Sequence, residues 1–135
     1  MQIKEIIKKL EEFAPLETQE EWDNSGWQIL PINEEKNIEK IFLCLSLTKE
    51  NLIQAQKYNC DLIISHHPFL FPHAIPIEFN IGIPIYSIHT PLDIADGGTT
   101  DSLIKLLGYK SNKEEDFIRI VKFEFPTSLN NFVLN

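Results

Sequence analysis

The chain has 135 residues, of which 43% are hydrophobic and 24% charged, so it can bury the core of one ordinary domain and does not have a disordered composition. Twelve Lys and Arg against 20 Asp and Glu give a formal net charge of -8, which makes nucleic acid an unlikely partner. Two cysteines, Cys44 and Cys60, are too few for a disulfide framework or a thiolate zinc site. We therefore predict one domain over residues 1–135, with reduced thiols.

Residues 3–13 have the pattern of an amphipathic helix. Isoleucine, leucine and phenylalanine recur at helical spacing, lysine and glutamate fill the other positions, and Pro15 follows. Because the charges of MQIKEIIKKL lie among its apolar residues, this start is neither a signal peptide nor a membrane span. We therefore expect a cytoplasmic protein with no membrane partner.

Residues 21–30, EWDNSGWQIL, interrupt the helical pattern. Asp23, Asn24, Ser25 and Gly26 favour turns, and a tryptophan stands on either side of them. We predict an ordered loop with an aromatic anchor. The spacing of its residues assigns it no function.

Three apolar runs predict the strands of a sheet. They are residues 40–47, 61–65 and 83–88, and the first is expected to be buried on both faces. Between the first two runs, Thr48 can cap a helix that ends near Tyr58. The inward face of this helix is predicted to contain Leu52, Ile53, Ala55 and Gln56. This succession of strand, helix and strand predicts an α/β fold in which the first two strands are parallel.

The last third of the chain is predicted to contain a turn, a helix, a strand and the beginning of a second helix. Residues 90–99, TPLDIADGGT, are rich in turn formers, and Gly97-Gly98 is interpreted as a turn that needs a positive φ. A helix is expected from about Thr100 to Leu107, ended by Gly108. The remaining predictions are a strand over 117–125 and a helix that begins within 127–135.

Two of the apolar runs end at histidine. In open α/β sheets ligands bind beyond the carboxyl ends of the strands, so residues at these ends are the first candidates for a site. One run ends in His66-His67-Pro68, and another ends in His89, with Asp93 four residues later. If the two strands are parallel neighbours, about 4.8 Å apart, three imidazoles and a carboxylate converge at one edge.

The two adjacent histidines have a purely structural alternative. Successive side chains of a regular strand point to opposite faces, which would separate the rings of His66 and His67. Pro68 argues against this alternative, because a central strand cannot continue through proline and the backbone must turn there. We therefore favour a shared metal site.

The donor set suits several divalent metals. Imidazole nitrogens and a carboxylate, with no cysteine nearby, suit zinc, iron, manganese, cobalt or nickel better than copper(I). Asp93 could bridge two ions, and such pairs activate water for hydrolysis. His89 could complete the ligand shell, or it could orient Asp93 or a bound water and transfer protons, and we favour the second role. His73, in a loop flanked by proline, is interpreted as a surface residue.

Three segments together resemble the signatures of a known family. They are WDNSGWQ at 22–28, DLIISHHPFLF at 61–71 and IYSIHTPLDIADGGTTDSL at 85–103. In this order they resemble the GTP cyclohydrolase I type 2 homologs, also called the NGG-one-interacting factor three-like family, over nearly the whole chain. The His-His-Pro and His-Thr-x-x-Asp motifs carry most of this specificity.

The resemblance implies a three-layer α/β/α fold with a mostly parallel or mixed sheet, as one half of a duplicated two-half protein. It implies His66, His67 and Asp93 as metal ligands, two ions per complete site, and a toroidal homohexamer. The loop at 22–26 is implied to form part of the wall near the metals. The family name implies a nucleotide substrate and hydrolytic opening of the GTP ring. A metal-binding regulatory or oligomeric interaction role without catalysis is the alternative.

The sequence departs from the family pattern at three points. The family's remaining ligands lie in a C-terminal His-x-x-x-Glu motif, which these 135 residues do not contain, so we expect a truncated or split member. The link between His67 and His89 is shorter than usual, and Ser46 stands where many members have aspartate. We therefore expect half of a dinuclear metal shell, with His89 as the catalytic residue that transfers protons.

Overall fold

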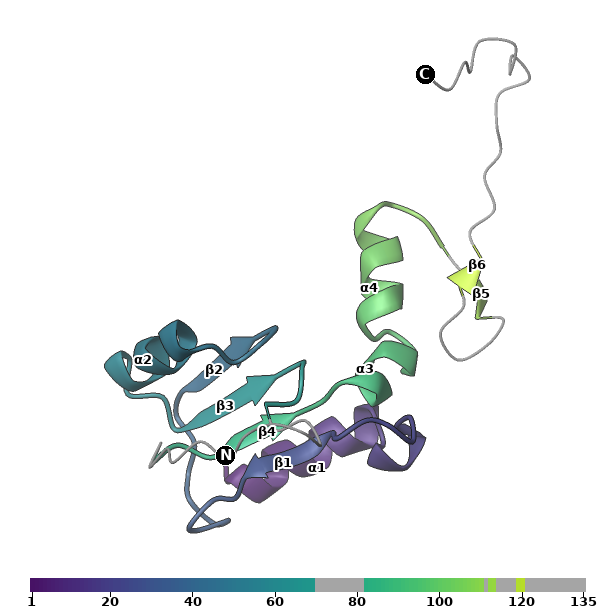
Figure 1. Ribbon diagram of the computed structural model, residues 1–135. Helices are drawn as coiled ribbons and strands as arrows, with labels where there is room; N and C mark the ends of the chain where they lie inside the picture. Colours follow the sequence, from purple (N-terminus) through teal and green to yellow (C-terminus); the bar gives the residue numbers. More distant parts are fainter. Residues whose placement is uncertain (70–81, 111, 114–118, 121–135) are drawn as a thin grey trace, which may run out of the picture.

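The structure is a computed structural model, and it describes residues 1–69, 82–110, 112–113 and 119–120, the last two pairs by their backbone alone. Figure 1 shows a small sheet with helices around it. The helices are α1 (Ile3–Phe13), the 3-10 helix η1 (Leu16–Thr18), α2 (Lys49–Lys57), α3 (Thr90–Ile94) and α4 (Thr99–Leu106). The strands are β1 (Gly26–Ile29), β2 (Ile41–Cys44), β3 (Leu62–Ser65), β4 (Ile85–Ser87), β5 (Asn112–Lys113) and β6 (Arg119–Ile120).

The main sheet is mixed and has four strands in the order β1-β4-β3-β2. Strands β2, β3 and β4 are parallel, whereas β1 runs antiparallel to β4. This confirms the α/β class and the parallel pairing of the first two predicted strands. Because β3 and β4 are neighbours, their carboxyl ends, which carry the histidine motifs, lie side by side.

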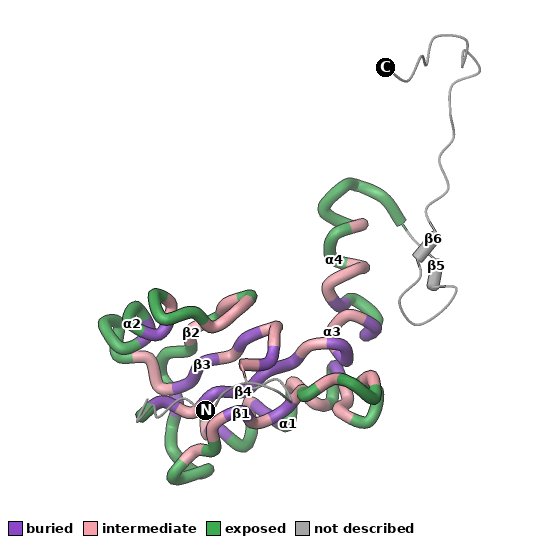
Figure 2. Tube along the Cα trace, viewed as in Figure 1, coloured by how far each residue is buried: buried purple, intermediate pink, exposed green. Residues whose placement is uncertain are grey.

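A helix packs on each face of this sheet. On one face Leu52 and Ala55 of α2 pack against Ile63 and Ile85. Alternating residues of the same strands point to the other face, as a pleated strand requires. There the buried residues of α1 meet the sheet in two clusters, whose buried members are Ile3, Ile7, Ala14, Ile38, Leu62, Tyr86, Ile88 and Ala95. The central strands are therefore covered on both sides, and Figure 2 shows β3 and β4 as largely buried.

The predicted helices follow local signals. The α1 helix was predicted correctly, and its first turn is held by the backbone N–H of Gln2, which donates to Glu5 Oε2 at 2.9 Å. Thr48 caps α2 by accepting from Asn51 N at 3.2 Å, as predicted. The α4 helix ends before Gly108, which has a φ of +82°. These helix ends were predictable because each depends on residues close together in the chain.

The prediction for strand 40–47 was wrong in one respect. Residues 41–44 form β2, but β2 is an edge strand, and Leu43 is 71% exposed. Burial depends on which segments lie beside the strand, and the apolar run does not contain this information. The same cause explains α2, in which Ile53 and Gln56 are exposed although they were predicted to face inward.

Two short elements occur where loops or turns were expected. Residues 26–29 form β1, which pairs with β4 and begins at Gly26 with a φ of +108°. Residues 90–94 form α3, whose first turn contains Pro91. Each element lies beside or among turn-forming residues and is not part of a longer apolar run, so its sequence predicted a loop or turn.

The turn at Gly97-Gly98 is partly as predicted. Gly97 has a φ of +79°, whereas Gly98 does not have a positive φ. Gly98 is needed for a different reason, because a Cβ there would lie 2.0 Å from the carbonyl oxygen of Leu92. The close approach of backbone to backbone sets the corner between α3 and α4.

Several predictions concern residues that the structure does not describe. The strand predicted over 117–125 is described only at residues 119–120, which pair with residues 112–113. The helix predicted to begin within 127–135 and the surface position of His73 lie outside the described residues. The single domain over 1–135 and the duplicated two-half protein stay predictions.

Two compositional expectations can be examined in the structure. Cys44 and Cys60 are both unpaired cysteines, and each is half-buried rather than fully buried. Within the described ranges no helix combines the length and the apolar character that crossing a membrane requires.

Candidate metal centre

The end of β3 turns both adjacent histidines toward one region. The backbone N–H of His66 donates to Cys44 O at 3.0 Å, and that of His67 donates to Leu45 O at 2.8 Å. The buried hydroxyl of Ser65 donates to His67 O at 2.9 Å and holds the turn before Pro68. The two imidazole centroids are 5.1 Å apart, so the rings do not lie on opposite faces of the sheet. The two rings therefore point to one region, as the turn at Pro68 predicted.

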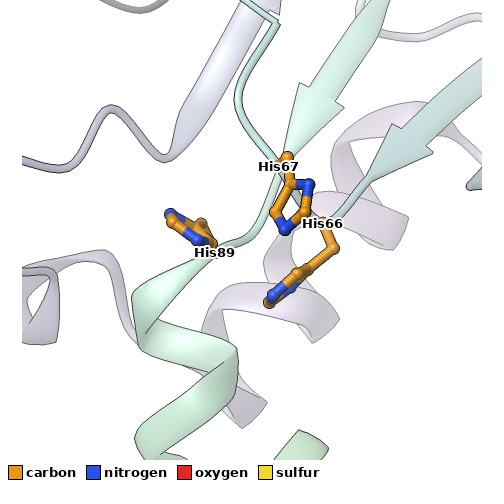
Figure 3. A group of neighbouring side chains, drawn as sticks. All are labelled: His66, His67 and His89. Carbon is orange, nitrogen blue, oxygen red and sulfur yellow. The ribbon is translucent and has the colours of Figure 1, made fainter. Parts of the chain in front are cut away.

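His89 joins this pair from the end of β4. Its ring centroid lies 5.0 Å from that of His66 and 5.4 Å from that of His67. One ligand nitrogen from each of the three rings lies within 4.8 Å of the others, and all three residues are half-buried. Figure 3 shows the three rings gathered at the strand ends. This group, His66, His67 and His89, could hold a metal ion and is called the histidine cluster below.

Each ring of the histidine cluster is anchored through Nδ1 by a different partner. His66 Nδ1 lies 3.1 Å from the carbonyl oxygen of Ile88, His67 Nδ1 lies 2.6 Å from Ser46 Oγ, and His89 Nδ1 lies 3.0 Å from Asp23 Oδ1. The remaining nitrogen, Nε2, is then the one that each ring can offer to a ligand. Metal-binding histidines in proteins are commonly oriented in this way.

Asp93 lies at the border of the histidine cluster. Its Oδ1 is 3.5 Å from His66 Nε2, and its side chain is 25% exposed. Thr99, in the first turn of α4, donates a hydrogen bond from Oγ1 to Asp93 Oδ1. The α3–α4 corner therefore sets the position of this carboxylate.

Asp23 is the buried carboxylate behind His89. Its side chain has no exposed surface, and it accepts hydrogen bonds from Asn24 N, Ser25 Oγ, Thr90 N and Thr90 Oγ1 besides the contact with His89. Burial alone would raise the pKa of Asp23, but the hydrogen bonds from Thr90, Ser25 and His89 outweigh burial and hold the pKa below its ordinary value. Asp23 is therefore ionised at neutral pH.

The electrostatic surroundings favour a neutral His67. Burial lowers the pKa of His67, and the neighbouring rings of His66 and His89 lower it further, against the opposing effect of Asp93. A metal ion binds the neutral form of imidazole, so this shift favours ligation over protonation.

An open cavity of about 450 Å³ adjoins the cluster. It is lined by Ser46, Leu47, His67, Pro68, Phe69 and His89. Beside it Trp22 is 56% exposed and packs edge-on against His89, with centroids 5.6 Å apart. The loop that contains Trp22 therefore lies next to the site, as the family resemblance implied.

The structure brings all four predicted site residues together. His66, His67, His89 and Asp93 meet at the ends of β3 and β4. Sequence reasoning missed the roles of Asp23 and Ser46, whose partners lie 66 and 21 residues away in the chain. A signal for Asp23 was present, since an aspartate between two tryptophans in a turn is a candidate for burial, but nothing in the sequence identified its partner.

Comparisons with known proteins agree with this geometry. The family model of Duf34/NIF3 (NGG1p interacting factor 3) matches residues 1–135. The GTP cyclohydrolase 1 type 2 homolog of Clostridium perfringens is 36% identical over 121 residues, which cover 81% of this chain and 45% of that protein. NIF3-like protein 1 of Dictyostelium discoideum is 41% identical over 120 residues, which cover 76% of this chain and 34% of that protein.

A solved structure resembles the chain in three dimensions. Reduced HcgD from Methanocaldococcus jannaschii superimposes with a TM-score of 0.72 at 32% identity, over 83% of this chain and 49% of HcgD. The chain thus spans about half or less of the length of these relatives. Because the family model matches all 135 residues, the chain belongs to the Duf34/NIF3 family.

Proposed function

We propose that this chain supplies part of a dinuclear divalent-metal site in a hydrolase-like protein, with His66, His67 and Asp93 as metal ligands. The observation that carries the proposal is the convergence of the histidine cluster, in which Nδ1 of each ring is anchored. A purely structural role would not require three imidazoles to converge with one nitrogen of each left for a ligand.

The donor set fits a divalent transition metal. Neutral imidazole and carboxylate groups suit zinc, iron, manganese, cobalt and nickel, and the lowered pKa of His67 favours its ligating form. Such an ion, when bound, acts as a Lewis acid and makes water a nucleophile at neutral pH. Of the residues described, the cluster and Asp93 offer ligands for one ion and part of a second. Under this proposal the other ligands lie outside the described residues.

The protein's own residues would orient the substrate and move protons. His89 has Nδ1 on the Asp23 carboxylate, so Nε2 is placed to take a proton at the cavity and to return it. Leu47, Pro68 and Phe69 give the cavity an apolar wall, and Trp22 adds an exposed aromatic surface next to His89. These features suit a substrate with a planar ring, and we propose a nucleotide such as GTP.

A non-catalytic metal-binding regulator is the second candidate. The number of ligands favours this candidate. Within the described ranges three imidazoles and one carboxylate lie together, and two metal ions would need more ligands than these four. The two candidates differ in one property, since only the first requires turnover of a nucleotide.

We also propose that copies of the chain associate with one another through β2. Ile41 and Leu43 of this edge strand are 38% and 71% exposed, and Leu45, which follows the strand, is 65% exposed. Residues 41–48 contain no charged side chain. A second copy can approach this strand without bringing charges of the same sign together, although each chain carries a net charge of -8.

The test of the proposed function compares metal binding and GTP turnover in four proteins. The wild-type chain, His67→Ala and Asp93→Ala are titrated with zinc and manganese by calorimetry, and GTP products are separated by chromatography. Asp96→Ala, which removes an exposed carboxylate from the same turn, is the matched control. We expect the first two variants to lose affinity by roughly tenfold or more and the control to keep it. Unchanged affinity in both His67→Ala and Asp93→Ala would refute the site, and tight binding without turnover would support the regulator.

A further inference from the structure

The loop before β1 encloses His89 on several sides. Ser25 Oγ accepts from the backbone N–H of His89 at 2.9 Å, and the ring of Trp22 packs against the imidazole. Asp23, between these two residues, reaches His89 Nδ1 at 3.0 Å. Three neighbouring residues of one loop therefore contact a single histidine that follows β4, about 66 positions later in the chain.

The hydrogen bonds of Asp23 determine which ring nitrogen of His89 carries the proton. Oδ1 accepts from Asn24 N at 2.7 Å, and Oδ2 accepts from Ser25 Oγ at 2.8 Å, from Thr90 N at 3.1 Å and from Thr90 Oγ1. A carboxylate that accepts from four donors can only be an acceptor toward a fifth group. The nitrogen facing it, Nδ1 of His89, must then be an N–H donor.

We propose that Asp23 is a positioning residue that fixes His89 in the tautomer with the proton on Nδ1, leaving the Nε2 lone pair for the histidine cluster. Only the role of Nε2, which is to bind an ion or to accept a proton, rests on the proposed function. The tautomer itself is a property of the metal-free chain. The side chain of Asp23 has no exposed surface, so Asp23 acts through His89.

Asp23→Asn should reverse the tautomer. The amide keeps one acceptor oxygen, and the three donors at Oδ2 favour placing it there. The amide nitrogen would then face His89 and donate to Nδ1, which moves the ring proton to Nε2. With Nε2 protonated, His89 can neither ligate an ion nor accept a proton at the cavity.

The test is nitrogen-15 NMR of the histidine side chains in the metal-free 135-residue chain at a pH where His89 is neutral. We expect Nδ1–H for His89 in the wild type and Nε2–H in Asp23→Asn, together with a zinc affinity lower by roughly 10–100-fold in the variant. Asp61→Asn removes a hydrogen-bonded carboxylate at the opposite end of β3 from the cluster and should leave the His89 signals unchanged. Ser25→Ala keeps the carboxylate and should also keep Nδ1–H.

The wild-type spectrum alone can overturn the inference, even if Asp23→Asn does not fold. A wild-type His89 with its proton on Nε2 contradicts it, and so does a folded Asp23→Asn chain that keeps Nδ1–H. A wild-type chain that shows Nδ1–H but binds no zinc supports the inference and refutes the proposed function. The two hypotheses can therefore fail separately.

Discussion

At the scale of single residues, the candidate site depends on what lies behind each imidazole. A main-chain carbonyl holds His66, a hydroxyl holds His67 and a carboxylate holds His89. The sequence predicted the four residues that face the site, because strand ends and Pro68 are local signals. It did not predict Ser46 or Asp23 as their supports, because such contacts join segments that only the fold brings together.

Ser46 provides a test at this scale. Its hydroxyl is 2.6 Å from His67 Nδ1, so Ser46→Ala removes the group that orients the ring. We expect zinc affinity measured by calorimetry to fall by roughly tenfold, with little change in the free energy of unfolding. Ser102→Ala, which removes a more exposed hydroxyl bonded to Gly97 O, is the control and should bind zinc as the wild type does. Equal affinity in both variants would show that Ser46 does not orient His67.

At the scale of elements, strands and helices were predictable where the sequence contains an apolar run or an amphipathic pattern. The runs that became β3 and β4 and the amphipathic α1 were identified from apolar spacing. The four residues of β1 and the five of α3 were missed because their conformations depend on pairing with β4 and on the corner that follows α3. The loop that contacts His89 directly precedes β1, and the corner that positions Asp93 directly follows α3.

The α3–α4 corner is tested by Gly98→Ala. A Cβ at Gly98 would lie 2.0 Å from Leu92 O and 2.9 Å from Ala95 O, so the backbone must move. We expect a loss of several kcal/mol, since backbone strain of this kind exceeds the roughly 1 kcal/mol of an ordinary glycine substitution. The movement should also displace Thr99 from Asp93 and weaken zinc binding.

Gly108→Ala is the matched control for the corner. Gly108 has a φ of +82°, which alanine adopts only with strain, but no atom lies within 4 Å of the added Cβ. Urea unfolding should show a smaller loss, about 1–2 kcal/mol, with unchanged zinc affinity. Equal losses for the two variants would mean that the close contact at Gly98 does not constrain the corner.

At the scale of the whole molecule, acid should destabilise the fold through carboxylates whose pKa is lowered by folding. Hydrogen bonds from Lys36 and from the backbone N–H groups of Glu39 and Lys40 lower the pKa of Asp61. Lys36 Nζ lies 2.8 Å from Asp61 Oδ1. Because the folded pKa is below the unfolded value, this stabilisation is present above about pH 4 and is lost as the pH falls through the folded pKa.

Asp61→Asn should therefore reduce the dependence of stability on pH. We expect the variant to unfold more easily than the wild type at pH 7, by about 1 kcal/mol, and the difference to shrink toward pH 2. Urea unfolding followed by circular dichroism between pH 2 and pH 7 measures this difference. A gap that stays constant over this range would contradict the account.

Self-association is the second property of the whole molecule that can be tested. Leu43→Lys places a charge at the most exposed apolar position of β2, and a second copy would bring two such charges together. Light scattering after size-exclusion chromatography should show assemblies in the wild type and smaller species in Leu43→Lys. Leu106→Lys, at an exposed leucine of α4, should leave the assembly unchanged. An assembly that Leu43→Lys does not alter would place the contact elsewhere.

The most direct measurement of the central claim is anomalous X-ray diffraction from crystals of the chain soaked in zinc. The account predicts an anomalous peak at the ends of β3 and β4, about 2.0–2.2 Å from Nε2 of His66 and His67 and from a carboxylate oxygen of Asp93. Zinc bound only at other places, with these three side chains free of it, would contradict the account.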